Sequence, residues 1–110
     1  MHDFLQIVTT TETKDDAARI AAALVERRLA ACAQVVGPIA STFRWEGKVQ
    51  TAEEWMCLAK TRRDLYAAVE TAIRELHPYQ VPEIVATAIV AGSEAYLKWV
   101  DGEVLSPSEL

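Results

Sequence analysis

Hydrophobic residues recur along the chain with two different periods, and these periods predict the order of its elements. A short apolar run from Phe4 to Val8 predicts a buried strand, because it is too short for a free-standing helix. The next stretch has helical spacing, and Thr13 stands three residues before Asp16 as an N-cap does. We therefore expect a first helix, whose buried stripe is Ala17, Ile20, Ala21 and Leu24.

From Ala33 the period changes to two, which predicts a long β-hairpin. Gly37-Pro38 predicts a bend or bulge in the first arm, because proline cannot donate to a strand ladder. Glu46-Gly47-Lys48 predicts a tight turn with glycine at a positive φ. The return strand, Val49 to about Lys60, is apolar on both faces and is therefore expected to be covered on both sides. Its two faces are Trp55, Cys57 and Ala59 on one side, and Met56 and Leu58 on the other.

A second helix is predicted after Thr61, which would cap it with Asp64 three residues on. Its buried stripe would be Leu65, Val69, Ala72, Ile73 and Leu76. We expect the helix to end at His77-Pro78, since the residue before proline is pushed out of the helical region.

The remaining segment predicts a loop, a strand and a short helix. Tyr79 to Pro82 is the loop, and Ile84 to Val90 is a β-branched run typical of a strand. Ser93 can cap a third helix. That helix would carry Tyr96, Trp99 and Val100 at helical spacing. For residues 102–110 we expect a stub strand followed by frayed residues.

The resulting order is β-α-β-β-α-β with an appended C-terminal helix. Two βαβ units that share one antiparallel sheet, with helices on one face, make an α+β ferredoxin-like plait. With 110 residues and no visible linker, the chain is expected to form a single domain over residues 1–110.

The hairpin is longer than a domain of this size requires. An arm over residues 49–60 would extend about 40 Å, whereas a domain of this length is about 34 Å across. We therefore expect the hairpin to project and to expose Trp45 and Trp55 near its outer part, unless a bend at Gly37-Pro38 folds its first part back. A projecting hairpin favours pairing with a neighbouring subunit in a closed ring.

Composition limits the possible functions. A net charge of −5 with no basic stripe argues against binding nucleic acid, and it leaves metal cations and cationic ligands open. No apolar run is long enough to span a membrane, and the N-terminus lacks the basic region of a signal peptide. Cys32 and Cys57 have apolar neighbours, so we interpret them as buried thiols in a cytoplasmic protein, although one disulfide is possible.

Five segments together resemble the CutA family of divalent-cation tolerance proteins, in that family's order and spacing. They are Ala31-Cys32-Ala33, Trp45-Glu46-Gly47-Lys48, Lys60-Thr61, His77 to Ile84, and Tyr96-Leu97 with Trp99. The resemblance runs from about Phe4 to Val100. It implies a homotrimer of ferredoxin-like subunits, similar to PII signalling proteins, with strands paired between subunits. It also implies an association with copper and other divalent metals.

The chain departs from this family at two positions. Some bacterial members carry a cysteine at the end of the first strand, where this chain has Val8 followed by Thr9, Thr10 and Thr11. Some carry a pair of histidines before the proline, where this chain has Leu76-His77. A soft-metal site built from that cysteine and both histidines cannot be carried over, and only His77 remains of it.

His77 and Glu83 are the candidate metal ligands, and each has a structural alternative. His77 offers an imidazole suited to copper or zinc, or its ring caps the final carbonyls of the second helix. Glu83 either coordinates a cation or pairs with Lys60. The cysteines share no metal-binding spacing, which favours core thiols.

A ligand cleft between subunits is the second candidate site. Its candidate residues are Trp45, Lys60, Tyr79, Glu83 and Trp99. The tryptophans are alternatively core or interface residues. No catalytic motif, and no nucleophile with an evident activating partner, is present, so the sequence does not predict an enzyme.

We therefore expect a homotrimeric protein that binds a small ligand or a divalent metal, with copper a possible metal and no firmly implied cofactor. The alternative is a signalling or scaffold module that acts through protein partners, with metal incidental. A third possibility is an enzyme with an unfamiliar site.

Overall fold

The computed structural model describes residues 3–110; Met1 and His2, which the sequence analysis used for the N-terminus, lie outside this range. Within residues 3–110 the elements follow one another in the predicted order. They are β1 (Phe4–Thr11), α1 (Lys14–Glu26), β2 (Cys32–Trp45), β3 (Lys48–Arg62), η1 (Arg63–Leu65), α2 (Tyr66–Leu76), β4 (Ile84–Ala88), α3 (Glu94–Glu103) and η2 (Pro107–Glu109).

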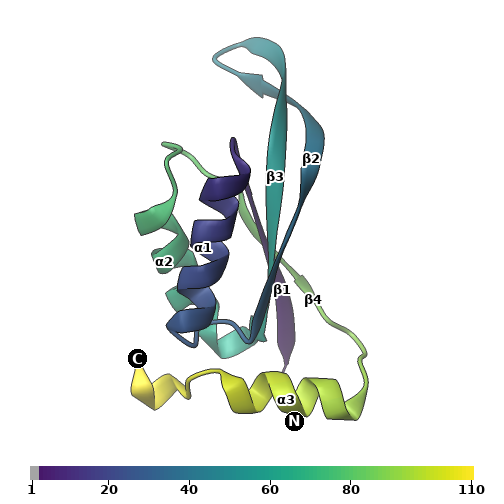
Figure 1. Ribbon diagram of the computed structural model, residues 1–110, viewed down its shortest axis with the longest axis vertical. Helices are drawn as coiled ribbons and strands as arrows, with labels where there is room; N and C mark the ends of the chain where they lie inside the picture. Colours follow the sequence, from purple (N-terminus) through teal and green to yellow (C-terminus); the bar gives the residue numbers. More distant parts are fainter. Residues whose placement is uncertain (1–2) are drawn as a thin grey trace.

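The strands form one sheet in the order β2-β3-β1-β4, and every neighbouring pair is antiparallel. Helices α1 and α2 lie side by side against one face of this sheet (Figure 1). This topology is the predicted ferredoxin-like plait. The two crossover helices place β1 and β3 at the centre of the sheet.

The core lies between the two helices and the sheet, and it follows the predicted stripes. Thr13 caps α1 as expected, because its Oγ1 accepts a hydrogen bond from the Asp16 amide at 3.1 Å. Helix α2 ends at Leu76, and His77 has extended backbone, as the following proline predicts. The buried residues of this core include Leu5, Ile7, Ala17, Ile20, Leu24, Cys57, Ala59, Val69 and Ile73.

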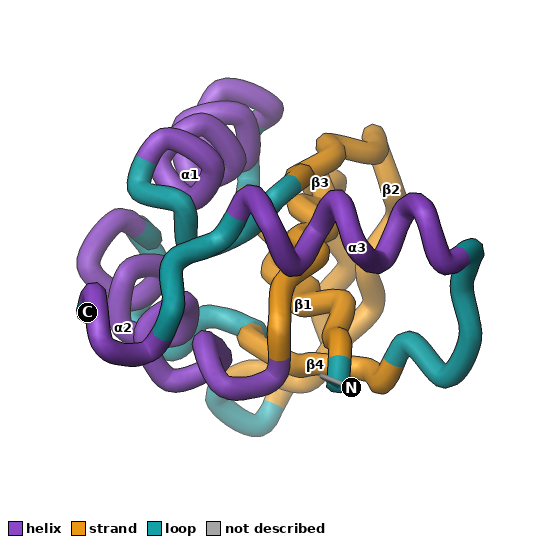
Figure 2. Tube along the Cα trace, turned by 90° about the horizontal axis from the view of Figure 1, so that it is seen from below, coloured by secondary structure: helices purple, strands orange, loops and turns teal. Residues whose placement is uncertain are grey.

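Helix α3 crosses the end of the sheet rather than covering either face in full (Figure 2). Ser93 caps it as predicted, accepting from the Tyr96 amide at 3.2 Å. Val100 packs with Phe4 and Leu65 in a second small cluster. The predicted stub strand is wrong, because α3 continues to Glu103 and the chain then bends back, with the Leu105 amide donating to the Arg28 carbonyl at 2.9 Å.

The predicted cap at Thr61 is also wrong. Strand β3 runs on to Arg62, and the Thr61 hydroxyl donates to the Leu29 carbonyl at 2.6 Å instead of reaching the start of a helix. Helix α2 begins only at Tyr66, after the η1 turn, and no side chain caps it. A buried carbonyl that needs a donor thus determines the position of this hydroxyl.

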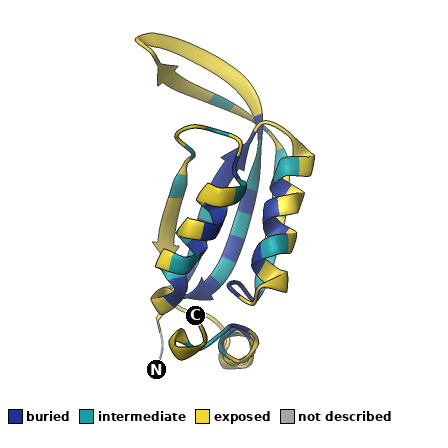
Figure 3. Ribbon diagram, turned by 90° about the vertical axis from the view of Figure 1, so that its left-hand side faces the viewer, coloured by how far each residue is buried: buried dark blue, intermediate teal, exposed yellow. Residues whose placement is uncertain are grey.

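The β2-β3 hairpin projects past the helices, as its length predicts (Figure 1). The pairing register shifts between Val36 and Ile39, which is the predicted bulge, and it then continues to the turn at Glu46 and Gly47. Both turn residues have positive φ, 50° and 78°. The hairpin is therefore bent at its root but not folded back, and its outer part is exposed (Figure 3).

The two hairpin tryptophans differ in position. Trp45 lies beside the turn and is 41% exposed, as expected. Trp55 was predicted to be near the outer part, but it lies opposite Thr11 at the root of the hairpin, half-buried, with its ring 5.6 Å from the Lys14 amine. Its ring packs against Gly37, where an added Cβ would come within 2.5 Å of it.

The sheet face opposite the helices carries an apolar patch, which we call the open sheet face. It consists of Val8, Val36, Met56, Leu58 and Val85, whose strand neighbours point into the core. Val8, Met56 and Leu58 are half-buried, and Val36 and Val85 are 46% and 49% exposed. The expectation that β3 is covered on both sides is thus not met within this chain. Among the described residues, no helix is long and apolar enough to cross a membrane.

Candidate functional site

A cleft of about 600 Å³ lies between the outer hairpin and the loop that follows α2. We call it the hairpin cleft. The hairpin contributes Ser41 to Trp45 and Glu54, and the loop contributes Tyr79, Gln80 and Val81 together with Glu83. Thr10, near the end of β1, completes the lining. The bulge at Gly37-Pro38 and the bend after α2 bring these segments together.

Glu54 is the buried charge of this cleft, with only 7% of its surface exposed. The Tyr79 hydroxyl donates to its Oε2 at 2.8 Å. Within residues 3–110, no lysine, arginine or histidine forms an ion pair with this carboxylate. A buried carboxylate with one neutral donor is energetically unfavourable unless a cation reaches it.

Tyr79 is held in a state that suits it to bind the carboxylate. Burial and its hydrogen bond to Glu54 raise the pKa of the Tyr79 phenol well above the usual value. The hydroxyl therefore stays protonated at neutral pH and remains a hydrogen-bond donor.

His77 fixes the loop from behind the cleft. Its Nδ1 accepts the Tyr79 amide hydrogen at 3.1 Å, so its Nε2 carries the proton and donates to the Thr10 carbonyl at 2.7 Å. The ring is buried and packs 4.8 Å from the Tyr79 ring. Both ring nitrogens therefore form hydrogen bonds with β1 and the loop. The predicted alternative, in which the ring caps the final carbonyls of α2, is wrong. A metal could bind His77 only by breaking one of these bonds.

Glu83 is an exposed carboxylate on the cleft wall. The predicted alternative, an ion pair with Lys60, is wrong, because the Lys60 amine donates to Gln34 at 2.8 Å. Arg44 is the cation on the wall, and its Nη1 donates to the Gly47 carbonyl at 3.4 Å. Across residues 3–110 no three histidine, cysteine, aspartate or glutamate side chains are grouped to hold a metal ion.

Of the five predicted cleft residues, the structure brings three together: Trp45, Tyr79 and Glu83. Lys60 lies opposite Gln6 and Cys32, toward the other end of β3. Trp99 is on α3, with its ring 5.6 Å from that of Tyr96. These two residues do not belong to the cleft.

Sequence reasoning missed Glu54. The sequence does contain an indication of it. Glu54, Met56 and Leu58 are at every second position of the strand and so lie on the same side of it, where Glu54 takes the place of an apolar residue. An acidic residue at such a position is rarely buried without a partner.

The cysteines lie outside the cleft, and both are free. Cys57 is a core thiol as predicted, 1% exposed, and burial raises its pKa to about 11. Cys32 is only half-buried, at the start of β2.

Comparison with known proteins gives consistent results. Residues 5–103 match the family described as CutA1 divalent ion tolerance protein. The chain is 42% identical over 96 residues to the divalent-cation tolerance protein CutA of Thermus thermophilus, covering 86% of this chain and 93% of that protein. It is 39% identical over 104 residues to the protein of the same name from Archaeoglobus fulgidus, covering 94% and 99%.

Solved structures of the same family have the same fold as this chain. The crystal structure of CutA1 from Oryza sativa aligns with a TM-score of 0.92 and 33% identity, covering 96% of each chain. The divalent cation tolerance protein from Thermus thermophilus aligns with a TM-score of 0.89, covering 92% of this chain and 98% of that one.

Proposed function

Because the chain belongs to the CutA1 divalent ion tolerance family, we propose that it acts as a homotrimer that binds a divalent cation or a small ligand in the hairpin cleft. The observation that carries the proposal is the pair of carboxylates, Glu54 and Glu83, on the walls of one cleft of ligand-binding size. Copper and zinc are the cations to test first.

Self-association is supported by two surfaces that a single chain leaves uncovered. The open sheet face presents five apolar side chains, and Val49, close to the hairpin turn, is 63% exposed. Exposed apolar patches of this kind mark interaction sites. A closed ring would cover both surfaces in every copy, which an open chain of copies would not.

Cation binding is supported by the charge of the cleft wall. Two carboxylates supply oxygen ligands, and the Tyr79 hydroxyl keeps one of them in a fixed orientation. A complete coordination sphere needs further ligands, which water or a neighbouring copy would supply. His77 contributes by holding Tyr79 rather than by reaching the cleft itself.

The hydrogen bond between Tyr79 and Glu54 in the hairpin cleft favours a role in binding over a role in catalysis. The Tyr79 phenol has a raised pKa and an occupied hydroxyl, so it is a poor general base at neutral pH. The Glu54 carboxylate is oriented by that hydroxyl, as a ligand for a cation would be.

One experiment tests assembly and binding together. Sedimentation equilibrium should give three times the chain mass of 12.2 kDa. Calorimetric titration of that species with Cu²⁺ and Zn²⁺ should give a dissociation constant on the order of micromolar. Val85→Lys, on the open sheet face, should sediment as single chains and bind at least about tenfold more weakly, because ligands from the neighbouring copy are lost.

Thr71→Lys is the matched control, because it places the same charge on the exposed side of α2. It should assemble and bind like the parent. A folded parent chain that sediments as a monomer, or that binds neither metal, would refute the proposal. Circular dichroism of Val85→Lys checks that the variant is folded.

A further inference from the structure

The hairpin cleft is larger and more aromatic than a bare metal ion requires. Its volume of about 600 Å³ falls within the usual range for sites that bind small organic molecules. Phe43, Trp45 and Tyr79 line it together with the two carboxylates. An inorganic cation gains little from three aromatic rings, whereas an organic cation can use both their faces and their apolar area.

The Glu54 carboxylate selects the charge of the occupant. It is 93% buried (7% exposed), and Tyr79 binds Oε2 but leaves the carboxylate without a cation from the described chain. The Arg44 guanidinium on the wall donates to the turn carbonyl of Gly47. A ligand that brings its own positive charge would therefore complete an otherwise uncompensated site.

We propose that the hairpin cleft binds an organic ammonium ion, with the charged nitrogen paired to Glu54 and the carbon body against Trp45, Phe43 and Tyr79. This inference rests on the proposed function, because it names the class of ligand for the same cleft. Glu83, exposed on the opposite wall, adds negative potential at the entrance and favours entry of a cation over an anion.

The test uses two probes of the same carbon skeleton, phenethylammonium and the neutral 2-phenylethanol. Calorimetric titration of the full chain should show that the ammonium binds about tenfold or more tightly than the alcohol, because only the ammonium forms a charge-assisted hydrogen bond. Glu54→Gln should remove that preference, since it keeps the size and the acceptor but loses the charge. Trp45→Leu should weaken ammonium binding several-fold by removing a cation–π partner.

Glu53→Gln is the matched control, because Glu53 is the exposed neighbour on the same strand and points to the other side. It should leave the preference unchanged. Equal binding of ammonium and alcohol to the parent would overturn the inference. So would a preference that survives in Glu54→Gln.

Two further outcomes separate this inference from the proposed function. If Zn²⁺ binds and phenethylammonium does not, the organic-cation inference fails and the cleft remains a metal site. If neither binds, and Glu54→Gln dissociates the assembly, the cation for Glu54 comes from a lysine or arginine of a second copy. That outcome overturns ligand binding in this cleft while leaving self-association intact.

Discussion

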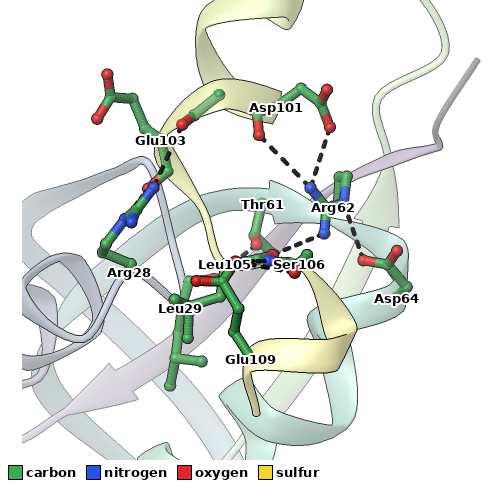
Figure 4. A network of polar contacts seen from close by, with 11 residues as sticks. Arg28, Leu29, Thr61, Arg62, Asp64, Asp101, Glu103, Leu105, Ser106 and Glu109 are labelled. Atoms are coloured by element: carbon green, nitrogen blue, oxygen red, sulfur yellow. Dashed lines mark hydrogen bonds and ion pairs between the residues drawn. The ribbon is translucent and has the colours of Figure 1, made fainter.

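Strand β3 carries two buried charges of opposite sign, Arg62 at its end and Glu54 at its middle, and the fold compensates the first fully and the second only in part. At one end, the Arg62 side chain is 6% exposed and donates to Asp64 at 3.0 Å, to Asp101 at 3.1 Å and to the Leu105 carbonyl at 2.7 Å (Figure 4). At the middle of the strand, Glu54 receives one hydrogen bond from a neutral phenol.

This difference distinguishes a structural cluster from the proposed binding site. The acceptors of the Arg62 cluster come from η1, α3 and the segment after α3, so the guanidinium joins the C-terminal part of the chain to the sheet. Burial alone would lower the pKa of Arg62, but the hydrogen bonds and charges of Asp64 and Asp101 outweigh it and raise the pKa. Among the described residues, Glu54 has no such set of opposite charges, which leaves capacity for a cation from outside.

The largest expected effect comes from removing the compensated charge. Arg62→Met should lower the free energy of unfolding by about 3 kcal/mol, because it breaks a buried ion pair and leaves the Leu105 carbonyl without its donor. Urea denaturation at one fixed protein concentration measures this loss. Arg63→Met, at the exposed neighbouring residue, should change stability by less than about 0.5 kcal/mol. Equal losses of stability in the two variants would show that the Arg62 cluster is not a special source of stability, and the contrast with Glu54 would disappear.

An intermediate effect is expected at Cys57, which lies between the two ends in the apolar core. Burial raises its pKa to about 11 from the ordinary value of 9.0, so the folded chain favours the neutral thiol. Stability from this group is therefore complete below pH 9 and is lost as pH rises through 11. The total loss should approach about 2.7 kcal/mol.

The difference in pH dependence between the parent and Cys57→Ala isolates this group, because buried tyrosines also ionise in alkali. The unfolding free energy of the parent should fall more steeply with pH than that of the variant. Parallel curves would show that the thiol does not ionise on unfolding in this range. A thiol reagent at neutral pH should leave Cys57 unlabelled until the chain unfolds.

The smallest effect is expected at Glu54, and its sign is opposite to that at Arg62. Glu54→Gln should raise the stability of the ligand-free protein by about 1 kcal/mol, because it removes a buried charge and keeps an acceptor for Tyr79. Thermal unfolding of both proteins without added amine or metal measures the change. A clear loss of stability in Glu54→Gln would indicate a cation already paired to Glu54, and the contrast with Arg62 would disappear.

The sequence predicted most of the fold because its signals are local. Thr13, Ser93 and His77-Pro78 mark helix ends through their own backbone chemistry, and the change of hydrophobic period marks the hairpin. Thr61 misled for a physical reason, since its hydroxyl donates to a carbonyl close in space instead of accepting an amide hydrogen at the start of a helix. In this fold that carbonyl belongs to Leu29.

The cleft could be predicted only in part, because its walls meet through the bend of the hairpin. Trp45, Tyr79 and Glu83 were identified from residue type and position, and they do lie together. Lys60 and Trp99 lie away from these three residues within one chain, so their place in a cleft between subunits stays a prediction. Glu54 was missed because its importance depends on Tyr79, 25 residues away in the sequence.

The close packing of Gly37 against Trp55 has a geometric consequence for assembly. An added Cβ at Gly37 would come within 2.5 Å of the indole, so only glycine allows the hairpin its present tilt against the body of the subunit. A small rotation of the hairpin about Gly37, at its root, would move the turn at its far end by a much larger distance. In a head-to-tail ring, that tilt sets the rotation from one copy to the next. If the chain forms the proposed homotrimer, a substitution at Gly37 would therefore change the rotation between copies, so that the copies would form an open spiral and not a closed ring.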